Sequence, residues 1–404
     1  MSHTKARVLL ASSHPMQNPV PLQLLSQSRD LDVLMAYCSL PGDKLGWGQE
    51  QITKQTFDVP MLDGYQWIRV RNYSPLPGLT RFYGLVNPGL IKLILKRDCC
   101  IVFGHSYVSF WLAIIASKFF GKPLILTTDA TSLESATGGS WKIPLKKRFY
   151  LYLYKQVADL VLVPSSAAKM FLASLGVSQG RIYITPYVVD NEYITLAADR
   201  ADRGKIRNDW GIASDAVVAV FCAKFISRKR PEDALRAFAQ ANVPNSYLVM
   251  VGDGPLKESL RAEAEQLQVT DRVRFLGLVK YSRLPEVYAA SDVLVFTSEH
   301  EPYGLPVNEA MLCGIPAIVS DRIGAGYDLV RTGETGFVYP CGNVGALASI
   351  LQEVLPDRTL LTKLGSNARK RMKTWSPREN ADATVQAILK ALTTKKRSGL
   401  LFSR

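Results

Sequence analysis

Short apolar runs alternate with longer amphipathic segments along this chain. In the first half the strand-like runs are ARVLLA, DLDVLMAY, CCIVFGH, KPLILTT and DLVLVPS, and segments with a helical pattern, such as YVSFWLAIIASKFF, lie between several of them. Nearly continuous apolar strands separated by helices are typical of a parallel sheet whose two faces are both covered. The pattern therefore predicts an α/β domain.

A second series of the same kind follows a polar stretch. After Tyr193 the chain reads ITLAADRADRGKIRNDWG, and strand-like runs then resume as AVVAVFCA, SYLVMVGDG, RVRFLG, DVLVFTS, PAIVS and GFVYP. We predict a first domain over residues 1–195, a second over 196–375, and a C-terminal helix over 376–404 that returns toward the first domain and ends in a basic tail. Parallel sheets bind ligands at the carboxyl ends of their strands, so two such domains predict a deep cleft between facing sheets.

The composition fits a folded protein of two or three domains. The chain has 404 residues, of which 47% are hydrophobic, so it can bury substantial cores. No apolar run approaches the ~18 residues that a membrane span requires, and KARVLLAS is too short for a signal-peptide core, so we expect a cytoplasmic protein. The six cysteines lack CxxC spacing, which indicates buried thiols, and the four histidines form no local metal motif.

The formal net charge of +14 indicates an anionic partner. Nucleic acid, an anionic membrane surface and phosphorylated substrates fit this charge equally well. A basic nucleic-acid-binding protein would need a groove-reading helix or stacking aromatics on a sheet. No such module is recognisable, so this alternative is the weakest and we expect no nucleic acid partner.

The stretch after DVLVFTS combines two acids with a glycine turn at the start of a predicted helix. In EPYGLPVNEAMLCG, Glu301 and Glu309 enclose the turn, Pro306 suits the first helical position, and Glu309 falls in the first turn. The amides around Gly304 and Leu305 predict a phosphate site, and carboxylates beside it suit sugar hydroxyls. Alternatively, Glu309 only complements the helix N-terminus and Glu301 is solvated.

Two lysines follow the first strand of the second domain. Lys224 comes directly after that strand in FCAKFISRKRPEDALRAF, and Lys229 lies before a helix that Pro231 opens. Because both lie at the carboxyl edge of the predicted sheet, we expect their ammonium groups to bind a diphosphate. We interpret Arg228 and Arg230 as an ordinary solvated basic loop.

The next strand ends in the glycine turn of LVMVGDGPLKESL. Gly252 and Gly254 allow the backbone to approach a ligand closely. Any turn from a strand into a helix has a similar composition, so this motif alone is weak evidence for a binding site.

The order of these motifs resembles the donor-binding half of the family-four retaining glycosyltransferases. The resemblance covers about residues 216–340 and rests on AKFISRKRP, VGDGP, RVRFLGLV, SDVLVFTSEHEPYGLPVNEAMLCGIPAIVS and TGFVY, including two glutamates separated by seven residues. It implies the GT-B fold, with two Rossmann-like α/β domains facing across a deep cleft, and a nucleotide diphosphate sugar as donor.

The resemblance also implies a role for each charged residue of the second domain. Lys224 and Lys229 would hold the diphosphate, Glu309 would bind the ribose hydroxyls, and Glu301 would contact hydroxyls of the donor sugar. The family usually has arginine where Lys224 stands, so a bidentate phosphate contact is replaced by a single ammonium group.

Further positions are similar to contact points of the family. The backbone at Leu278 and Val279, after RVRFLG, lies where the family contacts the nucleobase. In the first domain, IVFGHSYVSFWLAI and KPLILTTDATS correspond to two strand-end loops, with His105 on the first and Asp129 where the second usually has a histidine. With Glu301 these form the candidate catalytic group. Asp129 either binds a sugar hydroxyl, accepts the acceptor's proton or caps its turn, and His105 either contacts ligand or holds its loop.

The resemblance implies transfer with retention, in which the leaving diphosphate assists deprotonation of the acceptor. We expect no metal and no cofactor, because no acid pair follows a strand beside the diphosphate and lysines with a helix terminus can take a metal's place. The nucleotide diphosphate sugar is then a substrate. A sugar phosphorylase or a nucleotide-sugar epimerase would share this pocket and stays an alternative.

A basic and aromatic segment bears on the acceptor. Residues 141–155, in WKIPLKKRFYLYLYKQ, contain no acid and suit an anionic membrane surface if they form a helix. Alternatively, the helix packs its aromatic side chains inward and keeps its lysines in water. Peripheral contact with the inner face of a membrane predicts a lipid-linked acceptor, as in the synthesis of cell-surface polysaccharide or glycolipid, whereas its absence favours a soluble carbohydrate acceptor.

Overall fold

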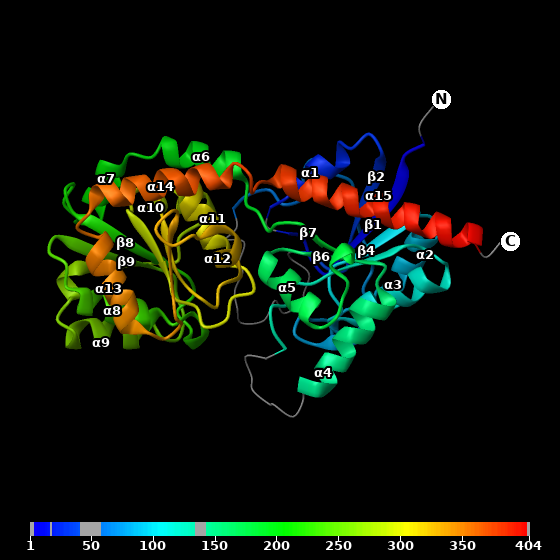
Figure 1. The fold of residues 1–404 in the computed structure, drawn as a ribbon, viewed down its shortest axis with the longest axis horizontal. Coiled ribbons are helices and arrows are strands. Elements are labelled where there is room, and N and C mark those ends of the chain that lie inside the picture. Colours follow the sequence, from blue (N-terminus) through cyan, green and yellow to red (C-terminus); the bar gives the residue numbers. More distant parts are fainter. Residues whose placement is uncertain (1–3, 17, 41–57, 134–142, 402–404) are drawn as a thin grey trace. The chain divides into compact units, whose positions relative to one another are not determined.

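The computed structural model describes residues 4–16, 18–40, 58–133 and 143–401 and divides into two compact units (Figure 1). Unit 1 contains Met1–Pro186 and Pro377–Arg404, and unit 2 contains Tyr187–Ser376. The sequence placed the first boundary after residue 195, but residues 187–195 belong to unit 2. The reason is that the Tyr187 carbonyl accepts hydrogen bonds from Asn308 and Trp375, both in unit 2.

Unit 1 is built on a seven-stranded parallel sheet in the order β3-β2-β1-β4-β5-β6-β7. The strands are β1 (Ala6–Ser12), β2 (Leu31–Tyr37), β3 (Trp67–Arg69), β4 (Cys99–Val102), β5 (Leu124–Thr127), β6 (Leu160–Val163) and β7 (Ile182–Ile184). Five of them were predicted from apolar runs. The two edge strands, β3 and β7, were missed because three residues are too few to show a pattern, and every residue of β3 is exposed.

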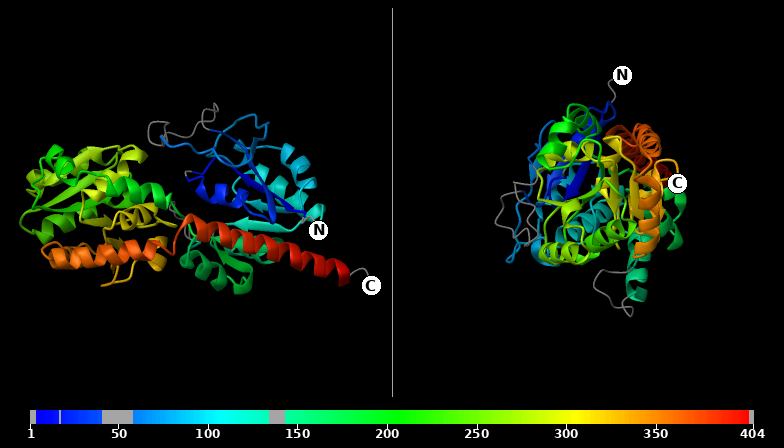
Figure 2. Two further views of the ribbon diagram at one scale, coloured as in Figure 1. Left: turned by 90° about the horizontal axis from the view of Figure 1, so that it is seen from above. Right: turned by 90° about the vertical axis from the view of Figure 1, so that its left-hand side faces the viewer.

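Helices cover both faces of this sheet. The core on one face contains residues of α2 (Gly89–Leu95), α3 (Val108–Phe119), α5 (Ser166–Ser174) and a π-helix, η3 (Leu151–Val157), which continues α4 (Ile143–Tyr150). The core on the other face contains residues of α1 (Val20–Ser26) and α15 (Pro377–Leu401) (Figure 2). Alternate residues of β1 belong to the two cores, Leu9 to the first and Val8 to the second.

Unit 2 is built on a six-stranded parallel sheet in the order β10-β9-β8-β11-β12-β13. The strands are β8 (Val217–Cys222), β9 (Ser246–Val251), β10 (Val273–Gly277), β11 (Val293–Phe296), β12 (Ala317–Ser320) and β13 (Gly336–Tyr339). All six coincide with predicted runs. The two parallel α/β sheets confirm the predicted fold class.

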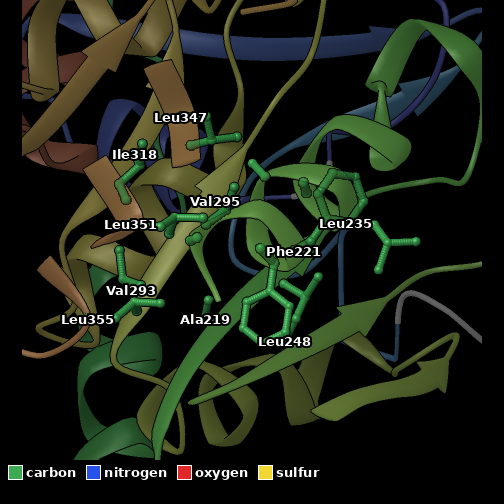
Figure 3. Close-up of a cluster of buried hydrophobic side chains, with 14 of the residues drawn as sticks. Ala219, Phe221, Leu235, Leu248, Val293, Val295, Ile318, Leu347, Leu351 and Leu355 are labelled. Atoms are coloured by element: carbon green, nitrogen blue, oxygen red, sulfur yellow. The ribbon is translucent and has the colours of Figure 1, made fainter. Parts of the chain in front are cut away.

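One face of this sheet carries a large core, in which Phe221, Val295 and Ile318 of the strands meet Leu347 and Leu351 (Figure 3). The helices are α6 (Asn191–Asp199), α7 (Arg203–Asp209), α8 (Pro231–Ala241), α9 (Lys257–Gln266), α10 (Leu284–Ala289), α11 (Leu305–Leu312), α12 (Gly324–Leu329), α13 (Val344–Val354) and α14 (Arg358–Met372). The polar stretch after Tyr193 therefore lies largely in two helices, α6 and α7.

A buried ion pair fixes α7 to the sheet of unit 2. Arg207, with only 1% of its surface exposed, donates to Asp292 Oδ2 at 2.6 Å and to three backbone carbonyls. The same carboxylate oxygen accepts the Val218 amide at 2.7 Å, and Arg203 donates to the other oxygen. All three guanidinium nitrogens of Arg207 donate to partners just before or at the start of β8 and β11, which compensates for burying the charge.

We predict that Asp292→Ala lowers the free energy of unfolding of unit 2 by about 3 to 5 kcal/mol, because it leaves Arg207 buried without a counter-charge. Urea unfolding of the purified variants measures this loss. The matched control is Arg203→Ala, which removes the more exposed partner and should lower the same free energy by about 1 kcal/mol or less. Equal losses in the two variants would contradict the account of Arg207.

Candidate functional site

The predicted residues of unit 2 all follow strands at one edge of its sheet. Because the strands are parallel, their carboxyl ends lie together, and the loops after them share that edge. These residues are Lys224 and Lys229 after β8, Gly252 and Gly254 after β9, Leu278 and Val279 after β10, and Glu301 after β11. Residues that are far apart in the sequence therefore lie at one edge of the sheet, where they form one candidate site.

The glycine turn before α11 has the conformation that the sequence suggested. Gly304 is the N-cap of α11 with φ of 107°, and an added Cβ would lie 3.0 Å from the Phe296 ring. The helix begins at Leu305, one residue earlier than predicted, and Pro306 is its second residue. Its first amides have no partner within the helix and can bind an anion.

The position of Glu309 in α11 differs from the prediction. The helix has no acid in its first turn, because Glu309 is its fifth residue. Its side chain is buried, with 5% exposed, and Tyr288 donates a hydrogen bond of 2.9 Å to Oε2. Burial raises the pKa of Glu309 to about 7, and the Tyr288 hydrogen bond opposes this rise. The alternative that Glu309 merely complements the helix N-terminus does not fit this position.

Glu309 has few polar neighbours to compensate its burial. Burial raises the pKa of Cys222 to about 12, and the nearby Glu309 carboxylate adds to the rise. Burial also raises the pKa of Tyr281, again with Glu309 as the next cause. A carboxylate held among a thiol and two tyrosines lacks the counter-charge that a purely structural buried acid needs, whereas ligand hydroxyls would supply donors.

The other acid, Glu301, forms an ion pair with Lys229. The Lys229 ammonium contacts Oε2 of Glu301 and lies 5.2 Å from the centre of the Phe296 ring, and both charged side chains are largely buried. Burial lowers the pKa of Lys229, Glu301 opposes the shift, and repulsion from Arg228 and Lys224 adds to it. Glu301 is therefore not simply solvated. The pair links two loops that are far apart in the sequence.

The basic loop after β8 is more ordered than the sequence suggested. Arg228 donates to the His300 carbonyl at 2.7 Å, and Arg230 forms two hydrogen bonds with the buried Asp233. Arg230 also has a left-handed backbone, with φ of 48°, where the 3₁₀ turn of the loop meets α8. Both arginine side chains are thus partly exposed, as expected of a solvated loop, but each also has a fixed hydrogen-bond partner. Lys224 is exposed at the end of β8.

The glycines of the GDG turn are explained by neighbouring backbone. An added Cβ at Gly252 would lie 1.9 Å from the Ala223 carbonyl oxygen, and one at Gly254 would lie 2.4 Å from that of Phe225. The Gly252 amide donates to the Gly277 carbonyl at 2.9 Å. The glycines thus bring the loops after β8, β9 and β10 together. Leu278, exposed, and Val279 follow directly.

In unit 1 the two candidate catalytic residues follow adjacent strands, β4 and β5. His105 is held through its Nδ1, which lies 3.1 Å from the Tyr154 hydroxyl, and through its carbonyl, which accepts from Trp111. Burial lowers the pKa of His105, so it is neutral near pH 7. Asp129 is exposed, and its charge adds to the effect of burial in raising the pKa of Tyr150.

Tyr154 is a site residue that the sequence did not single out. It lies in the π-helix η3 and is fully buried, where its hydroxyl hydrogen-bonds His105 and Thr128. π-Helical turns are rare and occur frequently at functional sites. The helical prediction for residues 141–155 carried no signal for this change of pitch, and Trp141 and Lys142 lie outside the described residues.

The described residues contain no group of three His, Cys, Asp or Glu side chains placed to hold a metal ion. Within the same ranges, every helix is too short or too polar to span a bilayer. All six cysteines lie within them as free thiols.

Two family models match the chain in succession. The model for glycosyl transferases group 1 matches residues 202–371, and the model for glycosyltransferase family 4 matches residues 50–193. The chain belongs to these glycosyltransferases. The first match contains every candidate residue of unit 2, and the second contains His105 and Asp129.

Relatives and solved structures of glycosyltransferases agree with this family. The chain is 25% identical to a D-inositol 3-phosphate glycosyltransferase of Rhodococcus erythropolis, over 95% of this chain and 91% of that enzyme. It is 31% identical to N-acetyl-alpha-D-glucosaminyl L-malate synthase of Bacillus anthracis, over 42% of this chain and only 44% of that enzyme. Anabaena HepE in complex with UDP matches 96% of this chain and 100% of its own, with a TM-score of 0.70 at 20% identity. That likeness confirms the GT-B fold.

The raised pKa of Glu309 predicts a pH-dependent stability in this glycosyltransferase. Between its ordinary pKa of 4.5 and about 7, the unfolded chain loses the Glu309 proton while the folded chain keeps it. The free energy of unfolding therefore falls as pH rises through this window, by up to about 3 kcal/mol. Glu309→Gln removes this fall, so the variant should be more stable than the wild type at pH 8.

Thermal unfolding midpoints at pH 5 and pH 8 measure the effect. Glu265→Gln is the matched control, because Glu265 is an exposed glutamate of the same unit and its loss should leave the pH dependence unchanged. The prediction fails if Glu309→Gln and the wild type lose stability in parallel between the two pH values.

Proposed function

We propose that this glycosyltransferase transfers a sugar, with retention of anomeric configuration, from a nucleotide diphosphate sugar to a hydroxyl of a carbohydrate or lipid-linked acceptor. The observation that carries the proposal is the ion pair of Lys229 and Glu301 beside the N-terminus of α11, with Glu309 buried on the same helix. An ammonium group and backbone amides bind phosphate, and carboxylates accept hydrogen bonds from sugar hydroxyls, so together these groups suit a phosphate attached to a sugar.

Each group has a part in this proposal. The Lys229 ammonium binds the diphosphate, and Lys224 and the amides of Gly304 and Leu305 donate further hydrogen bonds to it. Glu301, released from Lys229, then accepts hydrogen bonds from hydroxyls of the donor sugar. Positive charge fixed beside the departing diphosphate stabilises the transition state more than the ground state, which is how such a site accelerates transfer.

Glu309 and the loop after β10 are the proposed nucleoside contacts. The ribose hydroxyls supply the donors that the buried Glu309 carboxylate lacks. The backbone at Leu278 and Val279 is the proposed contact for the base. Structures of Anabaena HepE with UDP and with UDP-glucose support a nucleotide-sugar donor, and the relative from Escherichia coli is a UDP-Gal galactosyltransferase acting on a diphosphoundecaprenol acceptor.

The proposal requires no metal and no cofactor. A metal beside a diphosphate neutralises charge, and the two lysines with the amides of α11 can do the same. The free thiols fit the reducing cytoplasm, where we place the reaction. We infer that Asp129 and His105 of unit 1 act on the acceptor side, with Tyr154 fixing the orientation of the His105 ring.

The donor half is tested by calorimetric binding of UDP, GDP and ADP, with their sugar conjugates, in EDTA. We expect one nucleotide to bind selectively and Glu309→Gln to weaken it roughly 10- to 100-fold, because a hydrogen-bonded charge is lost. Glu301→Gln should leave nucleotide binding intact and lower transfer on the order of 100-fold. Glu299→Gln, an exposed neighbour of Glu301, is the matched control and should behave as wild type. Normal transfer by Glu301→Gln would refute its assignment.

Product analysis separates the alternatives. Release of nucleoside diphosphate together with a glycosylated acceptor of unchanged anomeric configuration supports retaining transfer. Sugar 1-phosphate formed only with inorganic phosphate would indicate a phosphorylase, and an epimeric nucleotide sugar formed without acceptor would indicate an epimerase.

The unit 1 residues are tested separately. Asp129→Asn should lower kcat by roughly 100-fold or more if Asp129 accepts a proton, with nucleotide affinity unchanged because the nucleotide residues lie in unit 2. Tyr154→Phe should have a smaller effect on kcat and shift its pH profile, because His105 loses its hydrogen-bond partner. A loss of nucleotide affinity in either variant would contradict this division of labour.

A further inference from the structure

The net positive charge of the chain comes entirely from unit 1. Unit 1 contains 26 Lys and Arg against 12 Asp and Glu, whereas unit 2 contains 23 of each. The whole formal net charge of +14 therefore belongs to unit 1. The phosphate-binding residues of the proposed donor site belong to unit 2, so that site does not explain the charge.

Half of this net charge, seven Lys and Arg residues without an acid, lies on one helix layer of unit 1. The helices α2, α3, α4, η3 and α5, which cover one face of the sheet, contain no Asp or Glu at all. They are neighbours: the Trp111 ring of α3 lies 5.9 Å from that of Phe149, and the Tyr150 ring lies 6.0 Å from that of Phe171 in α5 (Figure 1). An acid-free layer is unusual for solvent-exposed helices, which normally mix both signs of charge.

The outer side of α3 presents large apolar side chains to solvent. Phe110 and Ile114 face the sheet and are buried, whereas Ile115 and Phe119 are 62% and 82% exposed. At 100° per residue the last two project within 40° of each other, opposite the buried face. Scattered single apolar residues need no explanation, but a pair one turn apart on the outer side of a basic layer does.

The helix formed by α4 and η3 has both core-packed and solvent-exposed side chains. Its aromatic residues Phe149, Tyr150 and Tyr154 pack against the core, as one of the two alternatives from the sequence predicted. Leu145 and Tyr152 are instead 69% and 60% exposed. The inward packing of aromatic side chains therefore leaves two large apolar side chains of this helix exposed to solvent.

Two basic side chains lie between these outward residues in the sequence of α4 and η3. Lys147 and Arg148 are both exposed. We call the set Ile115, Phe119, Leu145, Lys147, Arg148 and Tyr152 the basic helix face. It combines the two kinds of side chain that insert into an acyl boundary and attract anionic headgroups.

We propose that the basic helix face docks unit 1 onto an anionic lipid bilayer. The contact is peripheral, because no helix in the described ranges can cross a membrane. A second copy of the chain does not fit, since it would bring two strongly positive units together. Nucleic acid does not account for the aliphatic side chains of Ile115 and Leu145, which cannot stack on bases.

The test is sedimentation of the full chain with vesicles of phosphatidylcholine, with and without phosphatidylglycerol. We expect binding to the anionic vesicles that weakens as salt is raised. Lys147→Gln with Arg148→Gln should lower the partition coefficient roughly 25-fold, about fivefold for each basic residue near the lipid. Ile115→Ser with Phe119→Ser should lower it by roughly tenfold or more through lost apolar insertion.

Matched controls lie on unit 2. Lys370→Gln with Lys373→Gln makes the same charge change, and Leu196→Ser with Leu267→Ser removes two partly exposed leucines. Both should bind as wild type. Equal binding to vesicles without phosphatidylglycerol, unchanged binding by the two basic-helix-face variants, or RNA that displaces the protein from anionic vesicles would each overturn the proposal.

Nucleotide binding measured on the same preparations separates this inference from the proposed function. Both basic-helix-face variants should bind the donor nucleotide as wild type does, since the altered residues lie in unit 1. Vesicle binding without nucleotide binding in the wild type would refute the donor site alone, and nucleotide binding without vesicle binding would refute the docking surface alone.

Discussion

The close packing of two loops determines where both acids of the donor site lie. An added Cβ at Gly324 would be only 2.0 Å from the Pro302 carbonyl oxygen, so the loop before α12 touches the loop before α11 directly. The Gly324 amide donates to the Glu301 carbonyl at 3.0 Å, and the Ala325 amide donates to that of Tyr303. With Glu301 fixed at one end and the left-handed turn of Gly304 at the other, α11 has one possible start. Glu309 is placed by that start.

This rigid frame holds charges that the fold itself does not favour. Burial shifts the pKa of Glu309 upward and that of Lys229 downward, so in each case burial penalises the charged form. The Arg207–Asp292 pair shows the contrast, because its buried groups are satisfied by carbonyls and an amide. Among the described residues, Glu309 accepts one side-chain hydrogen bond, from Tyr288, and the Lys229 ammonium contacts one acid and one aromatic ring. Buried charges held by a fixed backbone are suited to binding an anion and hydroxyl groups. Their burial lowers the stability of the fold, which is the usual cost of a preorganised site.

Local pattern revealed most of the fold and only part of the site. Apolar runs located every strand of unit 2, and glycine with proline located the turn before α11, because these signals act over a few residues. The Lys229–Glu301 pair joins positions 72 residues apart, and single-sequence reasoning has no measure of that distance. The helix start was misplaced by one residue because Pro306 is compatible with either of the first two positions. The sequence pattern could not predict the π-helix that positions Tyr154, because its residues suit an ordinary α-helix equally well.

The distribution of charge between the two units adds information that the composition of the whole chain does not contain. A net charge of +14 fits nucleic acid, membranes and phosphorylated substrates alike, but phosphate binding needs only a few cations at short range. In the proposed donor site, lysines and helix amides of unit 2 would meet that need, although the formal charge of unit 2 is balanced. Unit 1 carries the excess positive charge, and its electrostatic attraction extends over roughly a Debye length of 8 to 10 Å. Such a long-range attraction acts more strongly on an extended anionic surface than on a small ligand. The two proposed kinds of anion attraction therefore belong to different units, so substitutions in one unit test each proposal separately.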